Sequence, residues 1–324
     1  MEKVGLMYMA DNDIKYNEPW IMQRADPYVY KHIDGWYYFT ASVPKYDGII
    51  LRRGRTLAEL PDAEEIMIWQ KHEEGIMSEH IWAPEIHYLD GKWYIYFSAG
   101  EKERIWDIRP YVLECSDENP LTGTWVERGK IQSVKEDVFS FEGFSLDATI
   151  LENKGRRYYI WAEKIGVGKQ ISNLYIAEME TPLKLKTVQV LLTTPDYDWE
   201  RQGFWVNEGP AVIKNSGRIY LTYSASETGI VYCMGMLSVD ENADLLDPLS
   251  WKKERYPVLK SCEDKGIYGP GHNSFTVDEN GDPIMVYHAR TEKVIEGNPL
   301  YNPNRHAMLM KIDFGEDGAP IFGF

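Results

Sequence analysis

Five segments of the chain share one pattern, and this repetition constrains the fold more than any other feature. Each segment has a polar residue, a short apolar run, a turn at a glycine and an aromatic-rich run. The turn glycines are Gly35, Gly91, Gly155, Gly217 and Gly281, spaced 56, 64, 62 and 64 residues apart. Apolar runs on both sides of such a turn predict a β-hairpin. The near-constant period leaves room for about four strands per unit, which indicates small sheets repeated around a central axis.

The fold class predicted from this repeat is all-β, and the architecture is a five-bladed β-propeller. We expect one catalytic propeller domain over residues 1–324, although a chain of 324 residues could also hold two domains. The five repeated segments are 25–42, 83–100, 147–164, 208–226 and 271–290. The alternative is a β-sandwich whose hairpins match by coincidence. Five matched hairpins favour the propeller.

The composition limits the kinds of ligand. The formal net charge is −16, which argues against nucleic acid and anionic membranes as partners. The chain has 11 Trp and 22 Tyr, residues that suit strands and also stack on sugar rings. No apolar stretch of 18 residues occurs, so no membrane-spanning helix is expected. A neutral ligand such as a sugar fits these properties.

The cysteines and the N-terminal segment predict a compartment. The three cysteines show no CxxC spacing, which excludes a zinc ribbon and a disulfide framework. The segment 1–20 has no basic region followed by an apolar run, so no signal peptide is expected. Sparse cysteines suit a reducing environment. The sequence therefore predicts a cytoplasmic protein.

One position of the repeat carries the candidate site. Eight or nine residues before the turn glycines stand Asp26, Trp82, Asp147, Glu208 and His272. In a propeller the first strand of each blade lines the central channel, so these side chains should converge at one end of it. Taken singly, each carboxylate would be a solvated loop residue. Three carboxylates gathered in one place would repel one another, so their clustering indicates a catalytic role or a bound cation.

Three other candidates have a structural and a functional interpretation. Trp82 is either a core residue or a stacking platform for a sugar. His272 follows a glycine-rich turn and is either a structural histidine or a pocket residue. Arg290 ends the fifth hairpin, where it would brace a carboxylate or a ligand hydroxyl, or else lie on the surface. We expect Trp82, Arg290 and His272 to bind the substrate.

Carboxylates with different pKa values are the groups that cleave glycosidic bonds. A protonated acid donates to the leaving oxygen, and an ionised carboxylate activates water or attacks the sugar. A third carboxylate raises the pKa of the acid by repulsion and orients it. The repeat alone does not say which acid has which role.

The motifs resemble glycoside hydrolase family 43 over nearly the whole chain. The resemblance lies in "RADPYVY" (24–30), "HIWAPEIHYLDGKWYIYFSA" (80–99), "SLDATIL" (145–151), "NEGPAVI" (207–213), "GPGHNSF" (269–275) and "YHAR" (287–290). It implies an inverting enzyme with Asp26 as general base, Asp147 as pKa modulator and Glu208 as general acid. It also implies a Ca²⁺ ion near His272 in the central channel, and an Arg290 that contacts substrate or acid.

Within the family, the segments 40–53 and 78–87 look most like α-L-arabinofuranosidases. We therefore expect release of terminal α-L-arabinofuranosyl residues from arabinan- or arabinoxylan-type oligosaccharides. The alternatives are a β-xylosidase, an endo-arabinanase or a non-catalytic sugar-binding propeller. The β-xylosidases usually carry a C-terminal sandwich domain, which is not expected here. Retaining fructan hydrolases are disfavoured because their Asn-Asp-Pro-Asn box is absent around Asp26.

Overall fold

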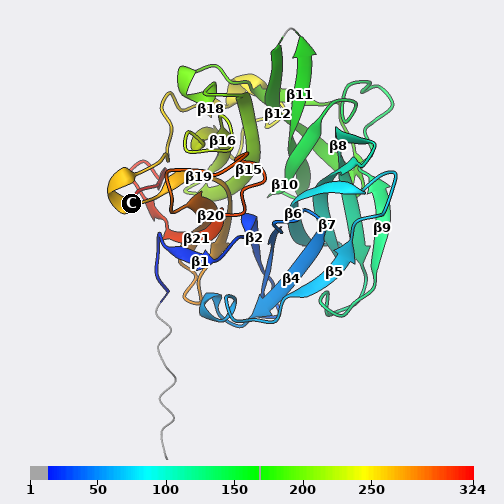
Figure 1. The fold of residues 1–324 in the computed structure, drawn as a ribbon. Coiled ribbons are helices and arrows are strands. Elements are labelled where there is room, and N and C mark those ends of the chain that lie inside the picture. Colours follow the sequence, from blue (N-terminus) through cyan, green and yellow to red (C-terminus); the bar gives the residue numbers. More distant parts are fainter. Residues whose placement is uncertain (1–13, 168) are drawn as a thin grey trace, which may run out of the picture.

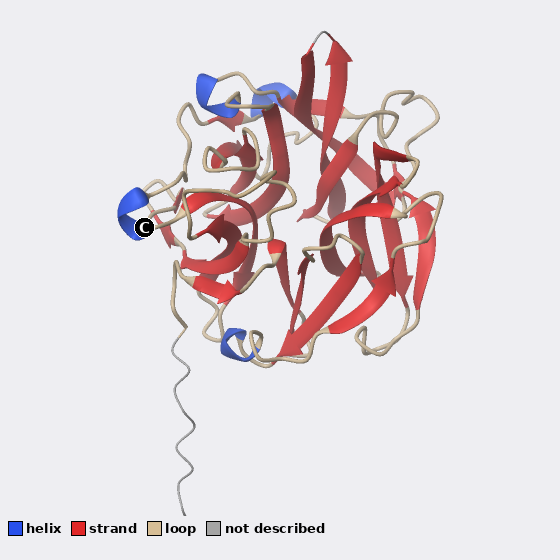
Figure 2. Ribbon diagram, viewed as in Figure 1, coloured by secondary structure: helices blue, strands red, loops and turns tan. Residues whose placement is uncertain are grey.

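The computed structural model describes residues 14–167 and 169–324, and this part of the chain is built from β-strands, as predicted (Figures 1 and 2). Two four-stranded antiparallel sheets come first in the chain. The first holds β2 (Ala25–Lys31), β3 (Tyr37–Ser42), β4 (Gly48–Gly54) and β5 (Ile66–Gln70). The second holds β6 (Glu79–Leu89), β7 (Lys92–Glu101), β8 (Arg104–Cys115) and β9 (Trp125–Lys130).

We call these two sheets the first and second units. A nine-stranded sheet follows, and its two antiparallel halves are the third and fourth units. The third unit holds β10 (Ser145–Asn153), β11 (Arg156–Val167) and β12 (Lys169–Thr181), with β13 (Lys184–Leu185) and β14 (Val190–Thr193) both paired to β12. The fourth unit holds β15 (Trp205–Asn215), β16 (Arg218–Ala225), β17 (Cys233–Asp240) and β18 (Lys252–Lys253). In the part of the chain that the structure describes, only a short parallel pairing of β12 with β15 joins the two halves.

The fifth unit combines the two ends of the described chain. It holds β19 (Tyr268–Val277), β20 (Pro283–Arg290), β21 (His306–Lys311) and the N-terminal β1 (Pro19–Ile21), in the order β1-β21-β20-β19. A separate two-stranded sheet pairs β22 (Asp313–Phe314) with β23 (Pro320–Ile321). Since β1 pairs with β21, the start and the end of the fold are joined by main-chain hydrogen bonds.

The five predicted hairpins are present. They are β2–β3, β6–β7, β10–β11, β15–β16 and β19–β20, and all five turn glycines have positive φ, between 73° and 90°. Glycine adopts this backbone conformation without the steric cost that a Cβ brings. The first strands of the hairpins contact one another in the cyclic order β2, β6, β10, β15, β19 and back to β2. Their starts therefore lie together near the middle of the molecule (Figure 1).

The apolar core is divided among the units. Five clusters of buried hydrophobic residues occur in the described chain. Four lie between two consecutive units, and the fifth lies mainly between the third and fourth units and extends to Trp82 and Tyr46. The helices of the described chain are four single 3₁₀ turns: η1 (Leu57–Glu59), η2 (Asp198–Glu200), η3 (Pro248–Ser250) and η4 (Glu263–Lys265). In the described residues, none has the length or hydropathy needed to span a bilayer.

Candidate active site

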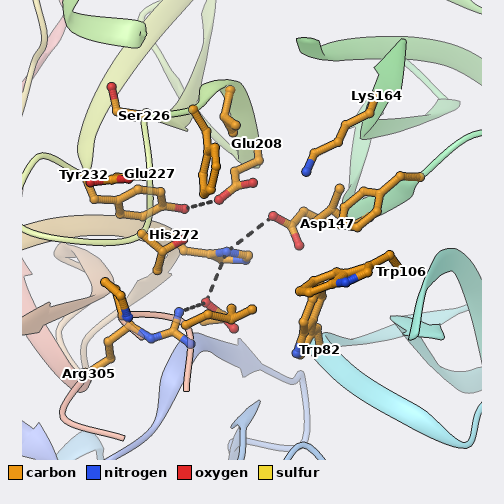
Figure 3. Close-up of a pocket in the computed structure, with 18 of the residues that line it drawn as sticks. Trp82, Trp106, Asp147, Lys164, Glu208, Ser226, Glu227, Tyr232, His272 and Arg305 are labelled. Carbon is orange, nitrogen blue, oxygen red and sulfur yellow. Dashed lines mark hydrogen bonds and ion pairs between the residues drawn. The ribbon is translucent and has the colours of Figure 1, made fainter. Parts of the chain in front are cut away.

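A cavity of about 820 Å³ lies where the first strands of the five units begin (Figure 3). Five of the six residues that the sequence singled out line it: Asp26, Trp82, Asp147, Glu208 and His272. They come from five different units, so residues as far apart as 26 and 272 share one space. The sixth, Arg290, is not among the described residues that line the cavity.

A β-bulge at the start of each first strand delivers these side chains. In every unit the register of the first hairpin shifts near its start, and residues there have a left-handed backbone. Besides His80 and Gly269, which lie at a further shift in the second and fifth units, each unit has one such residue. These residues are Asp26, Ala83, Asp147, Gly209 and His272, with φ between 42° and 55°. A bulge bends the strand and redirects a side chain. Trp82 and Glu208 each stand one residue before the bulge residue of their unit.

Asp26 is held as an anion. Its Oδ2 accepts a hydrogen bond from Ser42 Oγ at 2.6 Å, and its Oδ1 lies 3.5 Å from Nη1 of the buried Arg305. Nδ1 of both His272 and His288 lies 3.3 Å from Oδ1. Burial alone would raise the pKa of Asp26, but His272, Arg305 and His288 outweigh burial and hold it far below the ordinary value. Asp26 is therefore ionised at any working pH.

The pKa values of Asp147 and Glu208 are shifted in the opposite direction, upward. Burial raises the pKa of Asp147 well above its usual value, and the charges of Glu208 and Asp26 raise it further. Burial also raises the pKa of Glu208, against the opposing effects of Lys164 and of the hydrogen bond from Tyr232 Oη to Oε1 at 2.9 Å. The two acids are linked through the backbone, because the N–H of Gly209 donates to Asp147 Oδ2 at 3.1 Å. This pair therefore retains a proton more readily than Asp26 does.

His272 lies between two of the acids (Figure 3). Its Nδ1 is 3.3 Å from Asp26 Oδ1 and 3.6 Å from Asp147 Oδ2. Its ring also packs over Gly209, where a Cβ would come within 3.1 Å of the imidazole. Burial lowers the pKa of His272, and the charge of Asp26 opposes this effect. Any side chain at position 209 would displace this ring.

The predicted calcium ion finds few protein ligands. Calcium takes six to eight oxygen ligands. Among the described residues, no group of three or more His, Cys, Asp or Glu side chains is arranged to hold a metal ion. Calcium therefore stays a prediction, and no step of the chemistry below depends on it.

Aromatic side chains form one wall of the cavity. Trp82 stacks on His80 with ring centroids 4.5 Å apart, and Trp106 lies beside both rings. The indole N–H of Trp82 is buried and has no hydrogen-bond partner among the described residues. Trp106 is 52% exposed. This wall offers apolar ring faces to a ligand.

Arg290 supports a different wall. Its guanidinium donates to Asn302 Oδ1 and to the carbonyl of Pro299, both at 2.7 Å. Pro299 and its neighbours Asn298 and Leu300 line the cavity. Arg290 therefore fixes the loop before β21 from behind, and Arg305 is the arginine that contacts a carboxylate.

Sequence reasoning missed several residues of the site. Tyr46, Tyr232 and Arg305 all line the cavity and all stand one or two residues before the third strand of their unit. In an antiparallel sheet the first strand starts at the same end as the loop between the second and third strands. The segment just before each third strand was therefore a usable signal. Lys164, at the end of β11, points toward Asp147 and Glu208 (Figure 3).

Comparison with known proteins identifies the family. The model of glycosyl hydrolases family 43 matches residues 16–320. The chain belongs to glycosyl hydrolase family 43. The crystal structure of an α-L-arabinofuranosidase from Lactobacillus brevis superposes with a TM-score of 0.89, at 50% identity over 95% of this chain and 96% of that one.

Two curated relatives of this family 43 chain come from Streptomyces. A protein of Streptomyces avermitilis is 48% identical over 97% of this chain, and one of Streptomyces chartreusis is 47% identical over 91%. Both are named extracellular exo-α-(1→5)-L-arabinofuranosidase. This chain spans 64% of the length of the first and 88% of the second.

The prediction of a cytoplasmic protein is wrong, because relatives at 47–48% identity are named extracellular. A low cysteine count does not separate the two compartments for a fold of this size, since a large core needs no disulfides to be stable. The N-terminal residues 1–13, on which part of that prediction depended, lie outside the described residues.

Proposed function

We propose that the chain is an inverting glycoside hydrolase that releases terminal α-L-arabinofuranosyl residues from arabinan- or arabinoxylan-type oligosaccharides. We also propose that its five units are the blades of one β-propeller, a single catalytic domain over residues 1–324, of which 1–13 and 168 lie outside the described part. The cyclic contacts of the first strands and the pairing of β1 with β21 support this architecture.

One observation carries the mechanism: carboxylates in one cavity have pKa values shifted in opposite directions. Asp26 is held ionised, whereas the pair Asp147 and Glu208 retains a proton. Such a separation supports Asp26 as the base and one member of the pair as the acid. Asp26 would remove a proton from a water molecule that attacks the anomeric carbon. Glu208 would protonate the departing glycosidic oxygen, and Asp147 would hold Glu208 in place and keep it protonated.

The remaining predicted residues would bind the sugar. Trp82 offers an indole face, and His272 lies between base and modulator. Arg290 would act indirectly, through the loop that it fixes. If calcium binds at His272, it would add positive charge beside the acids.

The substrate class follows from similarity. Relatives at 47–50% identity are named α-L-arabinofuranosidases, and two of these names specify exo action on α-(1→5) linkages. We extend that specificity to this chain and infer that it acts outside the cell. Neither nucleic acid nor a membrane is expected as a partner, given the net charge of −16.

Hydrolysis of aryl glycosides separates this proposal from its alternatives. We expect release of nitrophenol from p-nitrophenyl α-L-arabinofuranoside and much slower release from p-nitrophenyl β-D-xyloside. Linear arabinan should yield arabinose from the start, whereas an endo-arabinanase would yield oligosaccharides first. A non-catalytic sugar-binding protein would release nothing from any of these substrates, and that result would reject the enzyme.

A further inference from the structure

At one position of the repeat, the side chain can accept a hydrogen bond from a backbone amide of the neighbouring unit. This position lies seven residues after each turn glycine, near the cavity end of the second strand. The residues there are Ser42, Ser98, Ala162, Ser224 and His288. We call this the acceptor position. Four of its five residues carry an oxygen or nitrogen that can accept a hydrogen bond, and Ala162 does not.

The four polar residues accept from the bulge residue of the next unit. Ser42 Oγ accepts from the N–H of Ala83 at 2.8 Å, and Ser98 Oγ from that of Asp147 at 3.2 Å. Likewise, Ser224 Oγ accepts from His272 at 2.7 Å and His288 Nδ1 from Asp26 at 3.0 Å. A bulge leaves an amide outside the strand ladder, and a buried amide needs a partner. The acceptor position supplies it.

The third unit breaks this rule. By the pattern of the other units, Ala162 should accept from the N–H of Gly209, but a methyl group cannot. The Gly209 amide instead donates to Oδ2 of Asp147, at 3.1 Å. Glu208 is the residue directly before Gly209. The carboxylate of Asp147 therefore fixes the backbone that carries Glu208.

The first unit shows what a serine does at the same place. Asp26 occupies the same repeat position as Asp147, and its Oδ2 accepts from Ser42 Oγ at 2.6 Å. Ser42 in turn accepts from the next amide, that of Ala83. A hydroxyl thus stands between the carboxylate and the amide in the first unit, whereas carboxylate and amide bond directly in the third.

We infer that Ala162 is a positioning residue. Because Ala162 has no hydroxyl, the Gly209 amide donates its hydrogen bond to Asp147 instead, and this bond holds Glu208 in place beside Asp147. Ala162 is fully buried in β11 and is not among the described residues that line the cavity. The catalytic consequence rests on the proposed function, but the hydrogen-bond arrangement does not. The same repeat position can therefore hold a base bonded to a serine hydroxyl in one unit and an acid bonded to the next unit's amide in another.

The variant Ala162→Ser tests this inference, with Ala162→Cys as the matched control. A serine hydroxyl should enter between Asp147 and the Gly209 amide, as Ser42 does beside Asp26. A thiol has similar size but is a weak acceptor and donor, so it should leave the direct bond in place. We expect kcat on an arabino-oligosaccharide to fall about 10- to 100-fold in the serine variant, because small displacements of reacting groups cost that much. The KM and melting temperature should change little, and the cysteine variant should keep its kcat.

Crystal structures of both variants separate this inference from the proposed function. In the serine variant, Asp147 Oδ2 should leave the Gly209 amide, even if the protein cleaves no furanoside. A retained bond, or an unchanged kcat in a protein that does cleave furanosides, would overturn the inference. If the serine variant does not fold, Ser42→Ala tests the converse. Its crystal structure should show Asp26 Oδ2 bonded to the Ala83 amide, and an Asp26 carboxylate that does not move there would overturn the rule.

Discussion

Removing the hydroxyl of Tyr232 should shift the pH at which activity is lost. Tyr232 Oη donates to Glu208 Oε1 at 2.9 Å, and this bond favours the ionised acid. The ring of Tyr232 stacks on His288 at an interplanar angle of 4°, a contact that phenylalanine keeps. The variant Tyr232→Phe therefore keeps the ring and removes the hydroxyl, with its bond to Glu208 and its hydrogen bond with Ser224.

The direction and size of the shift follow from the bond to Glu208. A hydrogen bond to a charged group contributes about 1.5–3 kcal/mol, and 1.36 kcal/mol corresponds to one pKa unit. Because the cavity admits water that partly replaces the hydroxyl, we expect the pKa of Glu208 to rise by about one unit. Glu208 must be protonated to act, so activity is lost as the pH rises through its pKa. The alkaline limb should therefore move to higher pH.

The assay is kcat/KM against pH for an arabino-oligosaccharide, whose sugar leaving group requires the acid. Lys164, Asp26, Asp147 and Arg305 also act on Glu208 electrostatically, and none of them is changed in the variant. Tyr96→Phe is the control, because Tyr96 donates at 2.8 Å to the carbonyl of Pro182, away from the cavity. An alkaline limb that stays in place or moves to lower pH would refute the assignment of Glu208 as the acid.

Three more predictions concern the acid, the rim and the metal. Glu208→Gln should lower kcat on arabino-oligosaccharides by about 10²- to 10⁴-fold but far less on p-nitrophenyl arabinofuranoside, whose leaving group departs without a proton; equal losses would contradict general acid catalysis. Trp106→Ala should raise KM about 2- to 10-fold with kcat unchanged, while Tyr256→Ala, an exposed aromatic outside the cavity, should have no effect. A lowered kcat for Trp106→Ala would instead place it at the reacting sugar. If calcium binds at His272, EDTA should lower the melting temperature and added CaCl₂ should restore it. A melting temperature that EDTA does not change would contradict the calcium prediction.

The repeat made the hairpins and most of the cavity predictable. The turn glycines mark the five hairpins, and counting back from them reaches five residues that line one cavity. The count was one residue off in two units, because the bulge residues there are Ala83 and Gly209. Periodicity cannot show a bulge, since a bulge adds a residue without changing the side-chain pattern on either side of it.

The residues that shift the pKa values were not predictable from that count. Arg305 and Tyr232 come from loops before third strands, and these loops differ in length from unit to unit. Arg290 was chosen because it ends a hairpin, but its guanidinium turns toward Pro299 and Asn302. Where a long side chain ends depends on the loop packed beside it. The sequence pattern does not contain that information.

Proton NMR of the first product tests the central claim, that a separated base and acid act on opposite faces of an arabinofuranosyl unit. With an α-(1→5)-linked arabino-oligosaccharide, the account predicts that arabinose appears first as the β-anomer, before it equilibrates in solution. Initial release of the α-anomer would mean that Asp26 attacks the sugar directly, and it would contradict the mechanism.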